Sequence, residues 1–334
     1  MDLNSRLKPQ RTLRKFKPVL VLGFVLLAAL LAGCESDDCV NCVELPPPVV
    51  PTGVHSISGD QEIIVQWYDI SYAPYDGAFN ENVVSYAIYS RFYQPGDEND
   101  GSREFFFIGE VAWDENFDPG TGLHWFYDTD VAHGEQYEYA VAAVNAAGRE
   151  SALSFELVTD APLPMSPLDG QGWHIPLTLF DGNGATSEAS GFDFERAAGN
   201  QSSLNAGRVN PATEYADIVV AFENNIPYVT ANPATVKLQD FGVFSGSGGL
   251  VFEGVSWAPA DGYSQTGKAE LIPGHIYVLE IRNPSLHYAK FGVTGRSSGA
   301  VDIIWAYQTI AGLPELKAPR DREPERDDVD IMSL

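Results

Sequence analysis

Basic residues are scarce in this chain of 334 residues, which has 20 Lys and Arg against 46 Asp and Glu. The formal net charge is -26, so nucleic acid and anionic lipid surfaces repel the protein. The imbalance excludes nucleic-acid binding as a main role and suits an acidic extracytoplasmic surface. The hydrophobic share of 44% is enough for a sizeable core and about two domains.

The sequence also lacks the short motifs of the common enzyme classes. It contains no Gly-x-Ser-x-Gly elbow, no His-Glu-x-x-His helix, no P-loop and no dinucleotide-binding fingerprint. A pair of glycosidase carboxylates would be hidden among so many acidic residues, but abundance alone is no evidence for such a pair. We therefore expect a protein that is not an enzyme and holds no metal or cofactor.

Cysteine is nearly absent, and the three that occur are Cys34, Cys39 and Cys42. Cys39 and Cys42 form a Cys-x-x-Cys pair, which in some proteins is a redox or metal site. Such a site needs a second ligand pair or a strand-to-helix context, and the sequence shows neither. We favour a small disulfide loop, since disulfides persist in oxidising compartments.

Only one long apolar run is present, at residues 19–32, and it follows a basic segment with six Lys and Arg. The run is short of the roughly 20 residues that span a bilayer. A basic start, a short apolar core and small residues at its end are typical of a secretory signal. The sequence therefore predicts export from the cytoplasm.

The four residues 31–34, Leu-Ala-Gly-Cys, resemble the lipobox of bacterial lipoproteins. The resemblance implies that the signal peptide 1–33 is removed and that Cys34 carries the lipid anchor. Residues 34–51 then form an acidic, proline-rich tether. Within it, 36–38 resemble an export signal of Bacteroidetes surface lipoproteins, although a plain acidic linker explains them equally well. We expect a protein anchored in the outer membrane or at the cell surface.

Residues 52–161 read as a series of short strands separated by Gly, Asp and Pro. Apolar and polar residues alternate within the runs, as they do in strands with one buried face. The expected strands are 62–67, 83–91, 105–111, 124–127 and 136–144. Short strands at regular spacing favour a β-sandwich.

This segment resembles a fibronectin type III domain. Trp67 stands where that family keeps a tryptophan in its second strand, and 128–137 matches the corner before its sixth strand. In that corner a tyrosine, here Tyr137, ties the chain back to the backbone. The turn at 143–151 also matches. The resemblance implies a spacer or binding scaffold, with Trp67 and Tyr137 in the core.

Residues 162–317 predict a second β-rich domain, so that the whole protein is all-β. Three prolines, Pro162, Pro164 and Pro167, predict a rigid hinge before it, and 235–241 predicts a short helical turn. The charged tail 318–334 predicts disorder. The expected strands are 190–194, 216–222, 227–230, 242–244, 274–281, 288–294 and 301–308.

The second half resembles a domain of bacterial surface lipoproteins that includes the HmuY-like haem-binding family. The motifs lie at 190–194, 273–278, 287–291 and 305–308. Haem-binding members use two histidines, and imidazole is a good axial ligand. The histidines of this half are His174, His275, at a strand start, and His287, expected at a turn. The alternative for each is an ordinary structural or exposed histidine.

We therefore expect a membrane-anchored binding or scaffold protein with an unknown protein or glycan partner. One alternative is the capture of haem or another small ligand. A less favoured alternative is carbohydrate binding on exposed aromatic faces. Its candidates are Trp173, Trp257 and Tyr263, which all lie in loops rich in Gly and Pro.

Overall fold

The computed structural model describes residues 45–70, 82–93, 104–200, 203–246 and 249–318. The predictions for Cys34, Cys39 and Cys42 therefore lie outside the described residues, as does the prediction of a disordered tail for nearly all of 318–334. In the described part of the chain, no helix is long and apolar enough to cross a membrane.

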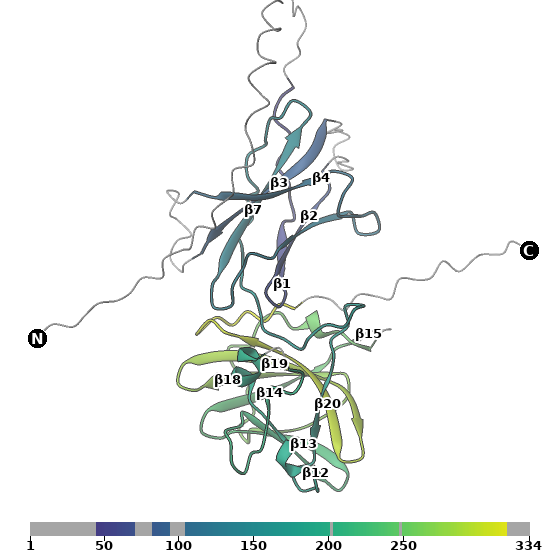
Figure 1. Cartoon of the computed structure of the whole chain (residues 1–334), viewed down its shortest axis with the longest axis vertical. Helices are drawn as coiled ribbons and strands as arrows, with labels where there is room; N and C mark the ends of the chain where they lie inside the picture. Colours follow the sequence, from purple (N-terminus) through teal and green to yellow (C-terminus); the bar gives the residue numbers. More distant parts are fainter. Residues whose placement is uncertain (1–44, 71–81, 94–103, 201–202, 247–248, 319–334) are drawn as a thin grey trace, which may run out of the picture. The chain divides into compact units, whose positions relative to one another are not determined.

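The N-terminal sandwich consists of two four-stranded antiparallel sheets (Figure 1). One sheet has the order β1 (His55–Ser58), β2 (Ile63–Tyr68), β6 (Leu123–Asp128), β5 (Phe117–Asp118). The other has the order β4 (Phe106–Ala112), β3 (Val83–Phe92), β7 (Tyr137–Asn145), β8 (Val158–Asp160). This order is that of a fibronectin type III-like sandwich, and the five predicted strands appear within a few residues of their expected ends.

Buried and partly exposed residues alternate along β2, and the buried ones form part of the core of this sandwich. Ile63, Val65 and Trp67 are fully buried on β2, and the residues between them are partly exposed. Trp67 packs against Tyr86 of the facing sheet at 5.4 Å between ring centroids. Burying such a large aromatic stabilises the fold more than any single aliphatic side chain does. The core role predicted for Trp67 and Tyr137 is confirmed.

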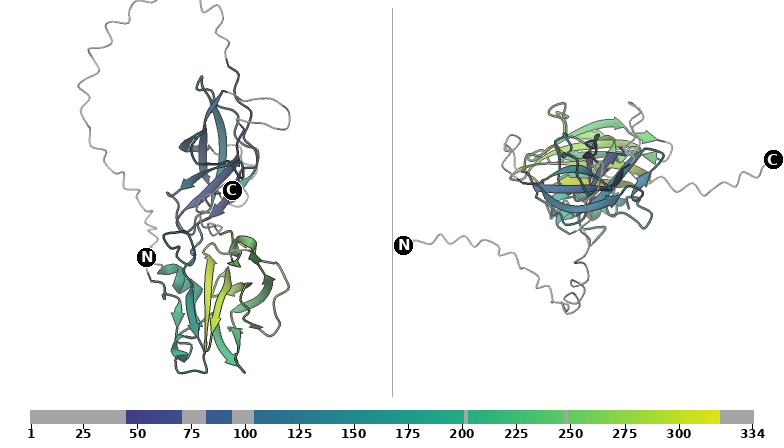
Figure 2. Two further views of the ribbon diagram at one scale, coloured as in Figure 1. Left: turned by 90° about the vertical axis from the view of Figure 1, so that its right-hand side faces the viewer. Right: turned by 90° about the horizontal axis from the view of Figure 1, so that it is seen from above.

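The C-terminal part contains two five-stranded antiparallel sheets (Figure 2). The first has the order β11 (Arg208–Val209), β10 (Gly191–Phe192), β12 (Ile218–Glu223), β13 (Ile226–Ala231), β17 (Lys268–Glu270). The second has the order β14 (Val236–Val243), β18 (His275–Arg282), β19 (Leu286–Ser297), β20 (Ala300–Gln308), β9 (Leu177–Phe180). Their shared core includes Phe192, Tyr277, Phe291 and Trp305. The predicted all-β fold is thus confirmed.

Short elements complete this part. They are η2 (Ser187–Ala189), α1 (Phe194–Gly199), η3 (Phe252–Gly254) and the hairpin of β15 (Ser245–Gly246) with β16 (Gly249–Leu250). Helix α1 begins after Asp193, whose side chain accepts a hydrogen bond from the backbone N–H of Arg196 at 3.0 Å. This N-cap ends the strand predicted at 190–194 two residues early.

Two further local predictions were wrong. Residues 235–241 are not a helical turn but lie mainly in β14, where Val236 and Leu238 are buried and Lys237 between them is exposed. That period of two matches a strand, and β14 pairs along nearly its whole length with β18. His287 lies inside β19 rather than at a turn.

The proline-rich connection at 161–166, where a rigid hinge was predicted, is fully buried. The N–H of Leu163 donates to the carbonyl of Gly59 at 2.9 Å, next to β1. The N–H of Ser166 donates to the carbonyl of Trp305 in β20 at 2.8 Å. The connection therefore belongs to the hydrogen-bonded structure on both of its sides.

Candidate functional site

The best candidate for a binding site is the outer face of the β4–β3–β7 sheet. Tyr89 pairs with Phe107 across β3 and β4, and Arg91 pairs with Glu138 across β3 and β7. Tyr86 and Ile88 of β3 point into the core, so Tyr89 and Arg91, further along the strand, point outward. We call Tyr89, Arg91, Phe105, Phe107 and Glu138 the aromatic face.

The side chains of the aromatic face hold one another in place. The Phe107 ring meets Tyr89 edge-on at 5.8 Å, and the Arg91 guanidinium lies 4.4 Å from the Phe105 ring centroid. Arg91 Nε donates to Glu138 Oε2 at 2.6 Å. These contacts restrict the rotamers, so a partner meets a surface that is already ordered.

Tyr89 is fixed at its far end as well. Its hydroxyl donates to Glu150 Oε2 at 2.6 Å. Burial and this hydrogen bond to a carboxylate raise the pKa of Tyr89 to about 12, so the phenol stays protonated at physiological pH. The ring is therefore a neutral platform with a fixed orientation.

Two neighbouring phenylalanines on β4 are exposed to solvent. Phe106 is 67% exposed and Phe107 is 57% exposed. Strand β4 is also the edge of its sheet among the described strands. Exposed aromatic residues next to an arginine have the composition of the energetically dominant part of protein interfaces. A surface of this composition is suited to contact with another protein.

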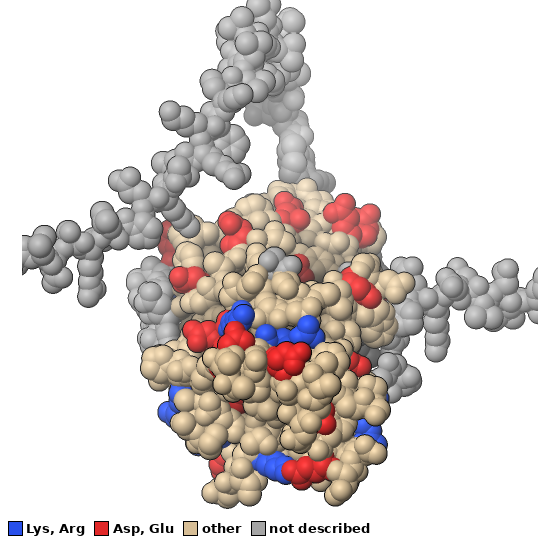
Figure 3. Space-filling model, turned by 60° about the horizontal axis from the view of Figure 1, so that its bottom comes forward, with Lys and Arg blue, Asp and Glu red and all other residues tan. Residues whose placement is uncertain are grey.

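Three carboxylates belong to or lie near the aromatic face. Glu138 is paired with Arg91, Glu150 accepts a hydrogen bond from Tyr89, and the charge of Glu110 acts on Tyr89 as well. On the face drawn in Figure 3, acidic and basic side chains are spread among uncharged residues.

The three aromatic residues predicted from the sequence lie in different settings. Trp257 is 52% exposed, and its backbone pairs with Glu315. Trp173 is partly buried in the loop between Leu168 and His174. Tyr263 lines a shallow hollow of about 440 Å³, and neither tryptophan is among the lining residues.

The hollow beside Tyr263 combines one aromatic ring with polar side chains from Lys237, Asp261 and Gln265. The Tyr263 hydroxyl donates to the carbonyl of Pro259 at 3.1 Å, and the Lys237 ammonium lies 5.9 Å from the ring. Burial, followed by the charge of Glu280, raises the pKa of Tyr263 above its usual value. Tyr263 therefore lines the hollow with its hydroxyl bonded to the protein and Lys237 over its ring.

The three predicted histidines each bond to the protein itself. His174 Nδ1 lies 3.0 Å from the carbonyl oxygen of Ser166. His275 Nδ1 lies 2.9 Å from Asp240 Oδ1, and His287 Nδ1 lies 3.0 Å from the carbonyl oxygen of Gln308.

The β18–β19 ladder separates two of these histidines. His287 pairs with Ile281, which is six residues along β18 from His275. At ~3.3 Å per residue the two lie about 20 Å apart, too far to ligate one iron. No group of three or more His, Cys, Asp or Glu in the described ranges is arranged to hold a metal ion.

Sequence reasoning missed the aromatic face, although a signal for it was present. Phe105, Phe106 and Phe107 are consecutive in the strand predicted at 105–111, and successive side chains of a strand alternate between the two faces of a sheet. Three consecutive aromatic residues cannot all point into the core of a sandwich. At least one had to be exposed, and exposed aromatic residues in a group mark an interaction surface.

No family model matches the chain, and a search of curated proteins finds no match. Among solved structures, a fibronectin type III-like protein from Clostridium thermocellum is 21% identical, covering 35% of this chain and 96% of its own, with a TM-score of 0.24. The FN5 domain of Drosophila Lar is 19% identical, covering 34% of this chain and 97% of its own, with a TM-score of 0.22. A DUF4466 family protein from Parabacteroides merdae is 8% identical, with a TM-score of 0.36. The match covers 79% of this chain and 95% of that protein. These are likenesses of fold and support no conclusion about activity.

Proposed function

We propose that the protein is a lipid-anchored, non-enzymatic binding protein of the bacterial envelope that docks a partner protein on its aromatic face. The observation that carries the docking is Phe107, more than half exposed yet ordered against Tyr89. The anchoring is supported by the Leu-Ala-Gly-Cys motif at 31–34.

The partner is a protein surface with apolar and basic residues. The chain is strongly acidic, and Glu110, Glu138 and Glu150 lie around the aromatic face. A basic partner is attracted over a distance of about a Debye length, ~8 Å at physiological ionic strength. Apolar contact with the exposed ring of Phe107 then supplies most of the affinity.

Crosslinking in intact cells with the Phe107→Ser variant tests the docking. Wild-type protein and a Trp257→Ser control are crosslinked in parallel, and bound proteins are identified by mass spectrometry. Trp257 is a suitable control because it is exposed to a similar degree but lies in the C-terminal part. We expect the partner to disappear only with Phe107→Ser. A partner that survives this change and is lost with Trp257→Ser contradicts docking on the aromatic face.

The anchor is tested separately with Cys34→Ser. Fractionation of cells should move this variant from the membrane to the soluble fraction, because several acyl chains bind a membrane far more firmly than protein contacts alone. Metabolic labelling with a radioactive fatty acid should mark the wild-type protein and leave the variant unlabelled. An unlabelled wild-type protein contradicts lipidation without affecting the docking proposal.

A second candidate function is glycan binding in the hollow beside Tyr263. It is favoured by the aromatic platform and by the polar side chains around it. A glycan array with Tyr263→Ala as the comparison tests it, and equal binding by both proteins excludes this hollow. Haem capture has less support, because the distance between His275 and His287 prevents both from binding one haem.

A further inference from the structure

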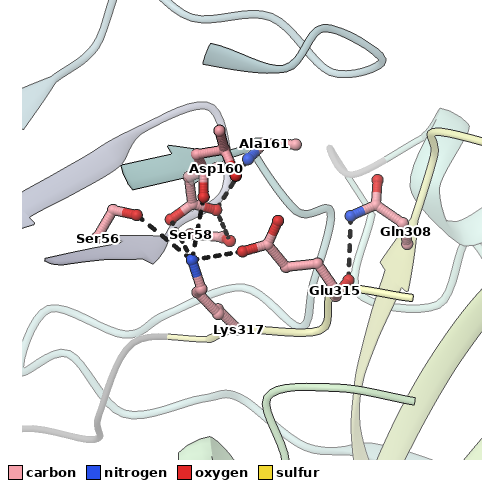
Figure 4. A network of polar contacts seen from close by, with 8 residues as sticks. Ser56, Ser58, Asp160, Ala161, Gln308, Glu315 and Lys317 are labelled. Atoms are coloured by element: carbon pink, nitrogen blue, oxygen red, sulfur yellow. Dashed lines mark hydrogen bonds and ion pairs between the residues drawn. The ribbon is translucent and has the colours of Figure 1, made fainter. Parts of the chain in front are cut away.

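A compact polar cluster joins the end of β8 to the segment that follows β20 (Figure 4). Its charged members are Asp160, Glu315 and Lys317. Asp160 has no exposed surface and Glu315 is 1% exposed. Carboxylates this well buried are rare unless they are paired or take part in chemistry.

The two oxygens of Asp160 have different surroundings. Oδ1 accepts hydrogen bonds from the hydroxyl of Ser58 at 2.5 Å and from the N–H of Ala161 at 2.8 Å. Oδ2 is buried without a hydrogen-bond partner among the described residues. The Lys317 ammonium nitrogen lies 3.7 Å from Oδ2. The carboxyl group thus presents one stabilised oxygen and one free oxygen to an amine.

Lys317 is held against this carboxyl by the groups around it. Its Nζ lies 2.5 Å from Glu315 Oε1 and donates to the carbonyl of Thr159 at 3.2 Å. It also donates to the hydroxyl of Ser56 at 3.4 Å. Figure 4 shows these groups converging on the amine from different segments of the chain.

The geometry points to an isopeptide bond between Lys317 Nζ and Asp160 Cγ, formed by condensation of the amine with the carboxyl group and loss of one water. No oxidant, reductant or other co-reactant is required. The step resembles intramolecular amide formation, for which a fixed approach replaces a large part of the entropic cost of bringing two groups together.

Each residue of the cluster has its own role in the condensation. A proton passes from the Lys317 ammonium to the Asp160 carboxylate, which leaves a neutral amine beside a neutral carboxyl group. Lys317 Nζ attacks Cγ, and the negative charge that develops on Oδ1 is stabilised by Ser58 and Ala161, as in an oxyanion hole. Glu315 takes a proton from the attacking nitrogen and delivers it to Oδ2. The Cγ–Oδ2 bond breaks, and Oδ2 leaves as water.

Glu315 is suited to this transfer. Its burial raises the pKa of the carboxyl to about 7, with a further contribution from the charge of Asp160. A carboxyl with a pKa near neutrality both accepts and releases a proton readily. Burial lowers the pKa of Lys317, but the charges of Asp160 and Glu315 outweigh burial and hold this pKa above its usual value. The amine therefore rests as an ammonium and attacks only after losing a proton.

The product also removes an electrostatic cost. Two carboxylates and one ammonium leave an excess negative charge in a nearly water-free site, which is expensive. Condensation turns Lys317 and Asp160 into a neutral amide. Only Glu315 remains ionisable, and with its raised pKa it can be neutral as well. The bond joins the end of the N-terminal sandwich to the segment after the last strand.

The test is a mass measurement on the purified full chain, digested with trypsin. We expect a branched species that joins peptide 150–196 to peptide 297–320 and is lighter than their sum by one water. Trypsin does not cut after a lysine whose amine is in an amide, so peptide 297–317 should be absent. Wild-type protein that yields peptide 297–317 in full, with no branched species, overturns the proposal.

Variants of the cluster test the assigned roles. Lys317→Arg keeps the positive charge but replaces the amine, and Glu315→Gln keeps the shape but removes proton transfer. Both variants should give only linear peptides, and their intact mass should equal the mass calculated from their sequence with no loss of water. A Lys268→Arg control should keep the branched species. A branched species in Glu315→Gln overturns the role of Glu315, and one in Lys317→Arg overturns the site itself.

Discussion

The hydroxyl groups of Tyr137 and Tyr277 make the same contact in two different sheets. Each accepts a hydrogen bond at 3.0 Å from the backbone N–H five residues upstream, on Ala132 and Ile272 respectively. In both cases a glycine in the left-handed region lies three residues before the tyrosine, at Gly134 and Gly274. The N-terminal sandwich and the C-terminal part thus use one corner motif, Gly-x-x-Tyr.

Removing either hydroxyl should destabilise the protein, because a backbone N–H loses its acceptor. We expect Tyr137→Phe to lower the free energy of unfolding by about 1–2 kcal/mol. Tyr277→Phe should cost more, since its hydroxyl also donates to the carbonyl of Glu270 at 2.6 Å. Urea unfolding with an unchanged m-value measures both. The control is Tyr68→Phe, because Tyr68 is exposed. If Tyr68→Phe lowers the free energy of unfolding as much as the other two variants do, the hydrogen bonds of Tyr137 and Tyr277 are not the cause of the loss.

Two glycines near α1 should respond oppositely to the same substitution. A Cβ on Gly207 would lie 2.5 Å from the buried ring of Phe192 and 2.6 Å from Ala197, so Gly207→Ala should cost about 1–3 kcal/mol. A Cβ on Gly199, the last residue of α1, would meet open space, so Gly199→Ala should be neutral or stabilise by up to about 1 kcal/mol. The measurement is the midpoint of thermal unfolding of both variants, compared with wild-type protein. Equal changes in midpoint for Gly207→Ala and Gly199→Ala would contradict the prediction.

Lys290 should make stability depend on pH above neutrality. It is fully buried in β19, and its ammonium donates to the carbonyls of Phe252 at 2.8 Å and Val255 at 2.7 Å. Burial lowers the pKa of Lys290 to about 7, partly opposed by the charge of Glu253. The unfolded chain keeps this proton up to about pH 10. Between these values the unfolded state binds more protons, so the free energy of unfolding rises with pH.

The measurement is urea unfolding between pH 7.5 and pH 9.5, compared between wild-type protein and Lys290→Met. We expect the upward slope to disappear in the variant, whatever its absolute stability, because methionine does not titrate. Lys268→Met, at an exposed ion pair with Glu223, should keep the wild-type slope. Parallel curves for wild-type protein and Lys290→Met would show that Lys290 keeps an ordinary pKa.

Much of the fold could be predicted because the strands carry a local signal. Ile63, Val65 and Trp67 alternate with partly exposed residues on β2, so the pattern and the structure coincide. The hydrophobic runs that became β12, β18 and β20 were recognised for the same reason. The corner at Tyr137 was also predictable, since glycine and tyrosine occur at the spacing that the turn requires.

The remaining elements depend on partners far away in the sequence. Strand β14 carries Lys237, Gln239 and Asp240 between and beside its apolar residues, and its pairing with β18 outweighs the weak strand preference of these polar residues. The aromatic face needs two strands in register, and one sequence does not specify which residues become neighbours. The cluster of Asp160, Glu315 and Lys317 joins residues more than 150 positions apart, so no local motif announces it.

The buried connection at 161–166 has a consequence for how the molecule comes apart. Because Leu163 bonds next to β1 and Ser166 bonds to β20, the connection cannot loosen without disturbing structure on both sides. Melting of one part exposes apolar surface and removes hydrogen bonds from the other. The described chain should therefore lose its structure in one cooperative step, and a protease should find no cleavable joint between its two halves.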